Sequence, residues 1–265
     1  MKTALVTGAS SGIGMQTARL LYDKGFYVIG TSRNADAIPA TSRIDGVEYR
    51  SLDLADLDSI ERFVSELGPV DAVVNNAGES QAGPLEEVPM DAVQRLFAIN
   101  VFGPVRLTQL LLPGMRKQRH GRVVMVGSML ASFPLAFRSS YVASKAAIKG
   151  FATAARRETE PFGVYLTTVE PGSINTGIGS RRTTYGAESV YRDDFATVLD
   201  ALARNEQAGI DAQAVANTIV EAIEQRRPET MYAIGSGAGR AFLLKRLLPS
   251  RIVESATARK HGLRG

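Results

Sequence analysis

Short apolar runs alternate along the chain with longer segments in which apolar residues recur every three or four positions. Runs such as "TALVT" are typical of buried strands, whereas Ile13, Thr17 and Leu20 would share one face of a helix. The pattern predicts strands over 3–7, 26–31, 47–54, 70–78, 121–128, 164–172 and 231–235, and helices over 12–25, 56–67, 89–117 (interrupted around "NVFGP"), 141–160 and 211–226. Because strands that alternate with helices form right-handed crossovers, we expect an α/β fold with a doubly wound parallel sheet of about seven strands.

The length of 265 residues fits one large α/β domain spanning 1–265, with a sizeable core. Residues 173–210 are less regular and are interpreted as an excursion from the domain, and residues 236–265 as a C-terminal extension. The apolar run at the N-terminus is too short for a signal peptide. No stretch approaches the roughly 18 apolar residues of a membrane span, so none is predicted.

The composition excludes several kinds of site and partner. The chain has no cysteine, which rules out disulfides and thiolate metal ligands, fits a reducing compartment and leads us to expect a cytoplasmic protein. His120 and His261 are distant in sequence and are interpreted as lone surface residues, not metal ligands. The isoelectric point of 9.4 comes from residues 240–265, whose net charge is +6, while the rest of the chain has −2. A nucleic-acid partner is therefore not expected.

The stretch "TGASSGIG" at 7–14 lies between the first predicted strand and helix, the context of a dinucleotide-binding loop. Gly8 would permit a tight turn, Gly12 would let the backbone approach a pyrophosphate, and Gly14 would let the helix and strand pack closely. The helix N-terminus would offer free N–H groups to the phosphates. A purely structural strand-to-helix turn is the alternative interpretation.

The end of the second predicted strand, "GTSRN" at 30–34, bears on the choice of cofactor. An acidic residue there would bind the ribose 2′-hydroxyl of NAD, whereas an arginine suits the 2′-phosphate of NADP. This stretch contains Arg33 and no acid. The pattern favours NADP(H) over NAD(H), although a solvated loop arginine is the plainer interpretation of Arg33 alone.

"YVASK" at 141–145 is a second candidate for chemistry. With no cysteine and only two histidines, the chain lacks the side chains that most often move protons near neutral pH. A lysine one helical turn after a tyrosine places an ammonium where it can stabilise the phenolate. A tyrosine and a lysine four residues apart are usually just a surface pair, so the motif needs its surroundings.

Taken together, these motifs resemble the short-chain dehydrogenase/reductase family in its compact single-domain branch. The matching stretches are "TGASSGIG" (7–14), "DLAD" (53–56), "NNAG" (75–78), "NVFG" (100–103), "VGSML" (126–130), "YVASK" (141–145) and "PGSINT" (171–176), in the family's order over about two-thirds of the chain. The last third looks loosely like steroid- and retinol-dehydrogenase-type members. The resemblance implies a Rossmann fold and a hydride transfer between a nicotinamide cofactor and a carbonyl or secondary alcohol.

The resemblance also implies a role for each matching residue. Tyr141 would be the general acid–base, Lys145 would support the phenolate and hold the nicotinamide ribose, and Ser128 would bind the substrate oxygen. Asn100 would support a water path to Lys145. Residues implied to bind the cofactor are Gly8, Ser10, Ser11, Gly12, Ile13, Gly14, Arg33, Asp53, Leu54, Asn76, Ala77, Gly78, Tyr141, Lys145, Pro171, Gly172, Ile174 and Thr176. Members that prefer NADP often carry a basic residue where this chain has Ser11, so the prediction of NADP(H) rests on Arg33.

Several segments admit two interpretations. The apolar stretch 129–137 is either a wall for an apolar substrate or ordinary packing. Residues 177–200 are either a mobile substrate lid or a solvated helix–loop. Within them Arg181 and Arg182 could attract an acidic substrate group, but we expect them to be solvated. The tail 239–253 is predicted as a basic amphipathic helix that either lies on an anionic membrane, caps a pocket or packs on another subunit.

The sequence-based hypothesis is therefore an NADP(H)-dependent carbonyl reductase or alcohol dehydrogenase for an apolar substrate. In the resembling family, faces such as those of the predicted helices at 101–117 and 141–160 pair subunits, which implies a homodimer or homotetramer. The alternative function is a non-catalytic NADP(H)-binding regulator on the same fold, and a dehydratase or epimerase is a third possibility. The complete set Asn100, Ser128, Tyr141 and Lys145 argues against a pure regulator, which has no need of an acid–base pair.

Overall fold

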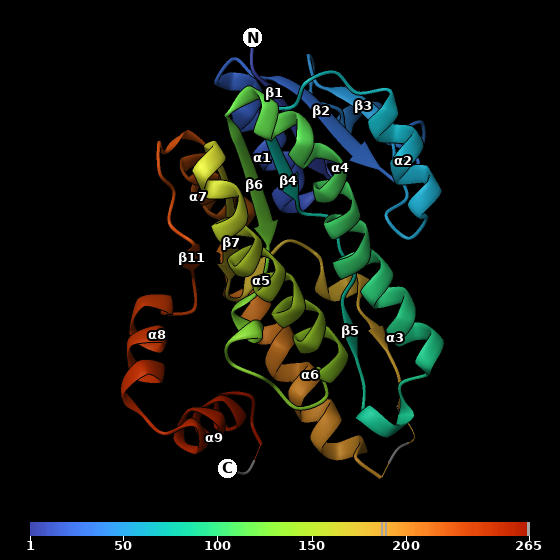
Figure 1. Cartoon of the computed structure of the whole chain (residues 1–265). Helices are drawn as coiled ribbons and strands as arrows, with labels where there is room; N and C mark the ends of the chain where they lie inside the picture. Colours follow the sequence, from blue (N-terminus) through green and yellow to red (C-terminus); the bar gives the residue numbers. More distant parts are fainter. Residues whose placement is uncertain (187, 189, 264–265) are drawn as a thin grey trace.

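The computed structural model describes residues 1–186, 188 and 190–263. Within them, seven parallel strands form one sheet in the order β11-β7-β6-β4-β1-β2-β3 (Figure 1). The strands are β1 (Thr3–Thr7), β2 (Tyr27–Ser32), β3 (Glu48–Ser51), β4 (Ala72–Asn75), β6 (Gly121–Val126), β7 (Val164–Pro171) and β11 (Met231–Ile234). The prediction of a doubly wound, Rossmann-like α/β fold is confirmed.

Helices cover both faces of this sheet (Figure 1). Helices α1 (Gly12–Asp23) and α7 (Ala212–Glu224) pack on one face, and α2 (Leu57–Ser65), α4 (Gly103–Gln118) and α5 (Ser139–Thr159) pack on the other. Each covering helix turns an apolar stripe towards the sheet, as a 3.6-residue repeat requires. Short 3₁₀ turns lie at Ala40–Ser42, Leu85–Glu87, Met129–Ala131, Glu160–Phe162 and Gly179–Arg181.

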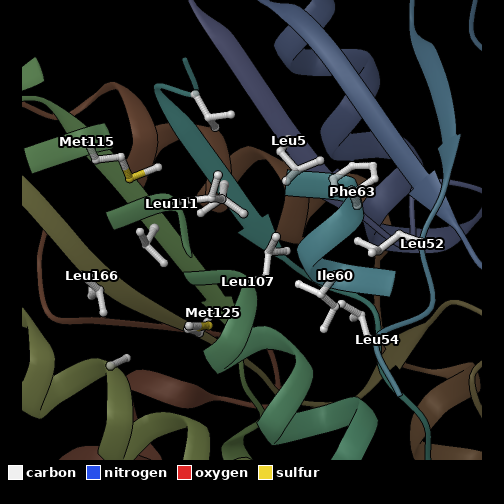
Figure 2. Close-up of a cluster of buried hydrophobic side chains, with 14 of the residues drawn as sticks. Leu5, Leu52, Leu54, Ile60, Phe63, Leu107, Leu111, Met115, Met125 and Leu166 are labelled. Atoms are coloured by element: carbon white, nitrogen blue, oxygen red, sulfur yellow. The ribbon is translucent and has the colours of Figure 1, made fainter. Parts of the chain in front are cut away.

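The strands are apolar throughout because both of their faces are buried. In β1, Leu5 packs into the cluster under α2 and α4, whereas Ala4 and Val6 point to the cluster under α1 and α7. Figure 2 shows the first cluster, in which Leu5 lies near Phe63 of α2. Truncating a fully buried leucine such as Leu107 of α4 to alanine would cost about 2–5 kcal/mol of stability.

The predicted interruption around "NVFGP" is a change of helix type and not a break. Helix α3 (Met90–Phe97) runs through a π-helical turn at Ala98–Phe102 into α4. This continuous run, Met90–Gln118, has the length and mean hydropathy of a membrane span, although polar residues such as Arg95 and Arg106 interrupt it. Half of its most apolar stretch is buried against the rest of the chain, as in the core helix of a globular fold.

The region predicted to be irregular contains helix α6 (Arg192–Gln207), followed by a small parallel pair between β8 (Ile174–Asn175) and β10 (Ile210–Asp211). A second pair joins β5 (Gln81–Ala82) to β9 (Thr183–Thr184). The small pairs tie this segment to the edge of the main sheet where the strands end.

The C-terminal extension forms two helices, α8 (Ala238–Leu247), which follows β11, and α9 (Ser250–Lys260), which lies near the C-terminus (Figure 1). The prediction of a single helix over 239–253 is wrong because of Pro249. Proline disfavours helical geometry in the residue before it, and Leu248 is extended, with φ −103° and ψ 148°. Pro249 then leads directly into α9.

Candidate active site

The strands β1, β2, β4, β6 and β7 all end at one edge of the sheet, where a cavity of about 1170 Å³ opens. Ligands of open parallel sheets bind at this edge. The predicted site residues Gly8, Ser10, Ser11, Gly12, Ile13, Arg33, Asp53, Leu54, Asn76, Ala77, Gly78, Ser128, Tyr141, Lys145, Pro171, Gly172, Ile174 and Thr176 line it. The other two, Gly14 and Asn100, lie buried behind the wall.

The loop after β1 has the conformation that its glycines predict. Gly8 and Gly12 adopt positive φ values of 69° and 55°, which suit glycine. A Cβ on Gly14 would overlap the carbonyl oxygen of Gly8, so this position must lack a side chain for α1 to approach β1. In the described chain Ser11 makes no side-chain cap to α1. The N–H groups at the start of the helix thus remain available to an anion, which fits the pyrophosphate of a dinucleotide.

The ends of β1 and β4 are held together beside this loop. The Thr7 hydroxyl oxygen accepts hydrogen bonds from the N–H groups of Asn76 and Ala77, each at 3.0 Å. The Asn76 amide nitrogen donates to the carbonyl oxygen of Thr7 at 2.9 Å. These bonds fix the backbone of 76–78 along the cavity, where the nucleotide was predicted to lie.

The adenosine end of the cavity contains an arginine that sequence reasoning missed. Glu79 lies 3.9 Å from Arg33 and also binds Arg95 of α3 through two hydrogen bonds of 2.8 and 3.2 Å. These hydrogen bonds and the charge of Glu79 raise the pKa of Arg95. Arg33 and Arg95 both line the cavity and share Glu79 as a partner, so two guanidinium groups lie near the end of β2. Arg95 is far from Arg33 in sequence, and no motif marks it.

Tyr141 and Lys145 lie one turn apart on α5 and are both nearly buried. The Lys145 ammonium donates a hydrogen bond to the carbonyl oxygen of Val126 at 2.9 Å, which anchors it at the end of β6. Its nitrogen is 5.8 Å from the centre of the Tyr141 ring. Ser128 follows β6, and its hydroxyl oxygen accepts from the Leu130 N–H at 3.2 Å, so its hydroxyl hydrogen is left for another acceptor.

Asn100 sits in the π-helical turn between α3 and α4. Its amide oxygen accepts from the Glu79 N–H at 2.8 Å, and its amide nitrogen donates to the Glu79 carbonyl at 3.0 Å and to the Ser144 hydroxyl at 3.2 Å. A Cβ placed on Gly78 would be 3.0 Å from the Asn100 amide oxygen and 3.7 Å from the Lys145 nitrogen. Asn100 thus joins the cofactor-facing backbone to α5.

A group of charged residues beside Tyr141 was not predicted as part of the site. The guanidinium carbon of Arg138 lies 4.4 Å from the centre of the Tyr141 ring, and burial lowers the pKa of Arg138 to about 10. The side chain of Arg182 is only 6% exposed and forms an ion pair with Glu206 of α6. The expectation that Arg182 is solvated is therefore wrong. Arg181 instead extends to the phosphate loop, where it donates to the Ser11 hydroxyl at 3.2 Å.

The C-terminal extension forms one wall of the cavity. The Phe242 ring of α8 packs edge-on against Phe133 at 5.1 Å between centres, and Lys245 donates to the Ser132 carbonyl. Leu244 and Leu248, with Ile252 and Val253, line the cavity from this side. The stretch 129–137 contributes both to the wall, through Met129, Leu130 and Phe133, and to the core, through Leu135.

His261, at the end of α9, is only 7% exposed and lines the cavity, so its interpretation as a surface residue is wrong. Burial lowers the pKa of His261, and the hydrogen bond between its Nδ1 atom and the Thr257 carbonyl, at 2.8 Å, acts in the opposite direction.

The chain is similar to proteins of one known family along most of its length. The profile of the family described as short chain dehydrogenase matches residues 2–185. An uncharacterized oxidoreductase, YusZ, of Bacillus subtilis is 34% identical, with 98% of each chain covered. An NADPH-dependent 3-dehydrocapnine reductase of Ornithobacterium rhinotracheale is 30% identical, covering 96% of this chain and 95% of that protein. The crystal structure of a short-chain dehydrogenase from Streptomyces avermitilis superposes with a TM-score of 0.81 at 32% identity, covering 98% of this chain and 96% of the other.

Proposed function

Since this chain belongs to the short-chain dehydrogenase/reductase family, we propose that it is an NADP(H)-dependent oxidoreductase that interconverts a carbonyl group and a secondary alcohol. The observation that carries the proposal is the pairing of Tyr141 with Lys145 in the wall of the cavity. Their side chains lie side by side on one face of α5, and Lys145 is held in place by the Val126 carbonyl. This is an acid–base arrangement that a binding protein would not need.

When bound, NADPH would supply the hydride that reduces the carbonyl carbon. The Tyr141 hydroxyl would donate its proton to the carbonyl oxygen, and Ser128 would donate a hydrogen bond to the same oxygen as negative charge develops there. The Lys145 ammonium would stabilise the phenolate that Tyr141 becomes, because a nearby opposite charge favours the ionised form. Its remaining N–H donors would bind the ribose hydroxyls of the nicotinamide half.

Asn100 would act on this set through the backbone. By bonding Glu79 and Ser144 it fixes the position of Gly78 relative to α5. Its place next to Lys145 also supports a water-mediated path for protons from Lys145 towards solvent.

The preference for NADP(H) rests on two observations. Arg33 and Arg95 both face the adenosine end of the cavity, and a guanidinium group binds phosphate oxygens with paired hydrogen bonds. The Ornithobacterium relative is named as NADPH-dependent.

The test is NADPH oxidation by the purified protein with a panel of aliphatic, aromatic, steroid and retinoid ketones and aldehydes. Replacing Tyr141 by Phe should lower turnover by about 10²–10⁴-fold, because the proton donor is lost. NADPH binding, followed by its fluorescence, should change little. Tyr22→Phe, at an exposed tyrosine of α1, is the matched control and should retain full turnover.

Retained turnover in Tyr141→Phe would contradict the proposed mechanism. Tight NADPH binding without turnover on any carbonyl of the panel would favour the non-catalytic NADP(H)-binding protein instead.

A further inference from the structure

The part of the cavity next to Tyr141 has a cationic corner formed by Arg138 and Arg182, which with Ser80 and Glu206 belong to the cavity wall. The Ser80 hydroxyl joins the two arginines, because it accepts from an Nη of Arg138 at 3.1 Å and from the Nε of Arg182 at 3.3 Å. The corner lies directly against the proposed proton donor, since the Arg138 guanidinium stacks on the Tyr141 ring at 4.4 Å.

Arg138 is the unusual member of this corner. It is 3% exposed, and its Nε has no hydrogen-bond partner within the described residues. A buried N–H group without an acceptor is costly, so native proteins rarely leave one unless a ligand, water or ion completes it. An arginine guanidinium is suited to an oxyanion, whose two oxygens can accept from its fork of N–H groups.

The charges of the corner do not balance. Glu206 forms an ion pair with Arg182 and neutralises it. Within the described part of the chain, no carboxylate lies within ion-pairing distance of Arg138. Although burial lowers the pKa of Arg138 to about 10, the group stays protonated at neutral pH. The corner therefore carries a net charge of about +1 on side chains that are mostly buried in the cavity wall.

The wall formed by the C-terminal extension is mostly apolar, although Lys245, Lys260 and His261 also line the cavity from this side. Leu244 and Leu248 of α8 and Ile252 and Val253 of α9 present an apolar surface to the same cavity. Phe133 extends this surface on the body of the protein. One cavity thus contains a buried cation beside the reacting group and an aliphatic wall that leads away towards the C-terminal helices.

We propose that the substrate is an amphiphilic oxo acid, with an anionic carboxylate or sulfonate a few bonds from the carbonyl carbon and an aliphatic chain beyond it. The anionic group would bind Arg138 with the help of Ser80, and the chain would lie against α8 and α9. This inference rests on the proposed function, because it names the substrate of the same site, and it replaces the expectation of a purely apolar substrate.

The first experiment compares freshly prepared 3-oxododecanoate with its methyl ester, which keeps the chain and the ketone but lacks the charge. The 4-oxo and 5-oxo acids and their esters then show which spacing between the carboxylate and the ketone the site prefers. In the wild type we expect kcat/KM for the best acid to exceed that for its ester by about 10-fold or more, as the loss of a charged hydrogen bond predicts. Dodecanoate should also inhibit competitively, and methyl dodecanoate should not.

The second experiment uses variants of the corner. Arg138→Gln should lower kcat/KM for the acid by about 10–100-fold, mainly through KM, and leave the ester within about 3-fold. Arg138→Lys keeps the charge and should restore part of the preference. Arg192→Gln, at an exposed arginine in the first turn of α6, is the control and should leave both substrates unchanged.

Equal use of acid and ester by the wild type, without inhibition by dodecanoate, would overturn the inference even if Arg138→Gln failed to fold. Equal losses on acid and ester in Arg138→Gln would also overturn it, because an arginine that only supports Tyr141 or the β5 segment gives this result. Turnover of neutral carbonyls but not of oxo acids would support the proposed oxidoreductase function and overturn the oxo-acid substrate. Absence of turnover on every carbonyl would remove both.

Discussion

The carboxylate of Glu79 lies 3.9 Å from the guanidinium of Arg33, at the end of β2 where a 2′-phosphate would lie. Arg33 is well exposed, and its partner Glu79 is held more firmly by Arg95 on the other side. An anionic 2′-phosphate must therefore compete with Glu79 for both arginines. The proposed selectivity for NADPH over NADH would thus depend on the acid Glu79 as well as on Arg33 and Arg95.

Replacing Arg33 by Asp should shift the cofactor preference from NADPH towards NADH. The variant removes a cation that pairs with the phosphate and adds an acid that can accept from the ribose 2′-hydroxyl. We expect kcat/KM for NADPH to fall by about 10-fold or more, with no fall for NADH. Steady-state kinetics with both cofactors measure this, and unchanged Michaelis constants for both would refute the assignment of Arg33.

Replacing Glu79 by Gln should act in the opposite direction. The amide keeps the size of the side chain but no longer neutralises Arg33 and Arg95, so the Michaelis constant for NADPH should fall several-fold while that for NADH changes little. A higher constant for NADPH would mean that Glu79 orients the arginines and does not compete for them.

The outer face of α8 provides a test of membrane contact. Leu243 and Leu247 are 58% and 69% exposed and do not line the cavity, and basic residues such as Arg240 and Arg246 lie nearby in sequence. We propose that this face binds anionic membrane surfaces, because apolar burial and attraction to charged lipids add together. Liposomes containing phosphatidylserine should therefore sediment the wild type and much less of a Leu243→Gln, Leu247→Gln double variant.

Two controls make this experiment specific. Neutral phosphatidylcholine liposomes should sediment less protein, and the double variant should keep its turnover because its leucines face away from the cavity. Removing residues 240–265 altogether is a poorer test, since it also deletes the wall that contains Leu244 and Leu248. Equal sedimentation of the wild type and the double variant would exclude this surface.

His261 should make the fold less stable as the pH falls into the mildly acidic range. Burial lowers its pKa below the ordinary value of about 6.5, and the charges of Lys260 and Arg138 act in the same direction. Above that value the residue is neutral in both the folded and unfolded chains and has no effect. As the pH falls through it, the unfolded chain binds protons more readily, so the free energy of unfolding decreases.

The measurement is thermal unfolding of the wild type and His261→Gln between pH 7.5 and 5.5. As the pH falls over this range, the melting temperature of the wild type should decrease more than that of the variant. His120, whose pKa is also lowered by burial, is present in both proteins and cancels in the comparison. If the melting temperatures of the two proteins changed equally with pH, the prediction would be contradicted.

The layered fold and the two central motifs were predictable because their signals are local. Apolar runs of strand length mark the sheet, and Gly8 and Gly14 mark a turn that other residues cannot adopt without strain or overlap. The four-residue spacing of Tyr141 and Lys145 places both on one face of a helix, whatever surrounds it. The break before α9 is equally local, since Pro249 signals it, although the predicted helix over 239–253 runs through it.

The tertiary structure alone decided the character of the substrate end of the cavity. Arg138, Arg182, Glu206 and His261 lie in separate elements, and nothing in their spacing indicates that they meet. Burial and charge pairing depend on which elements pack together, and long connections leave that choice open. The sequence alone thus determines the Tyr141–Lys145 pair on which the proposed reaction rests, through neighbours on one helix. The packing of α6, α8 and α9 at the sheet edge decides the shape and charge of the cavity beside that pair.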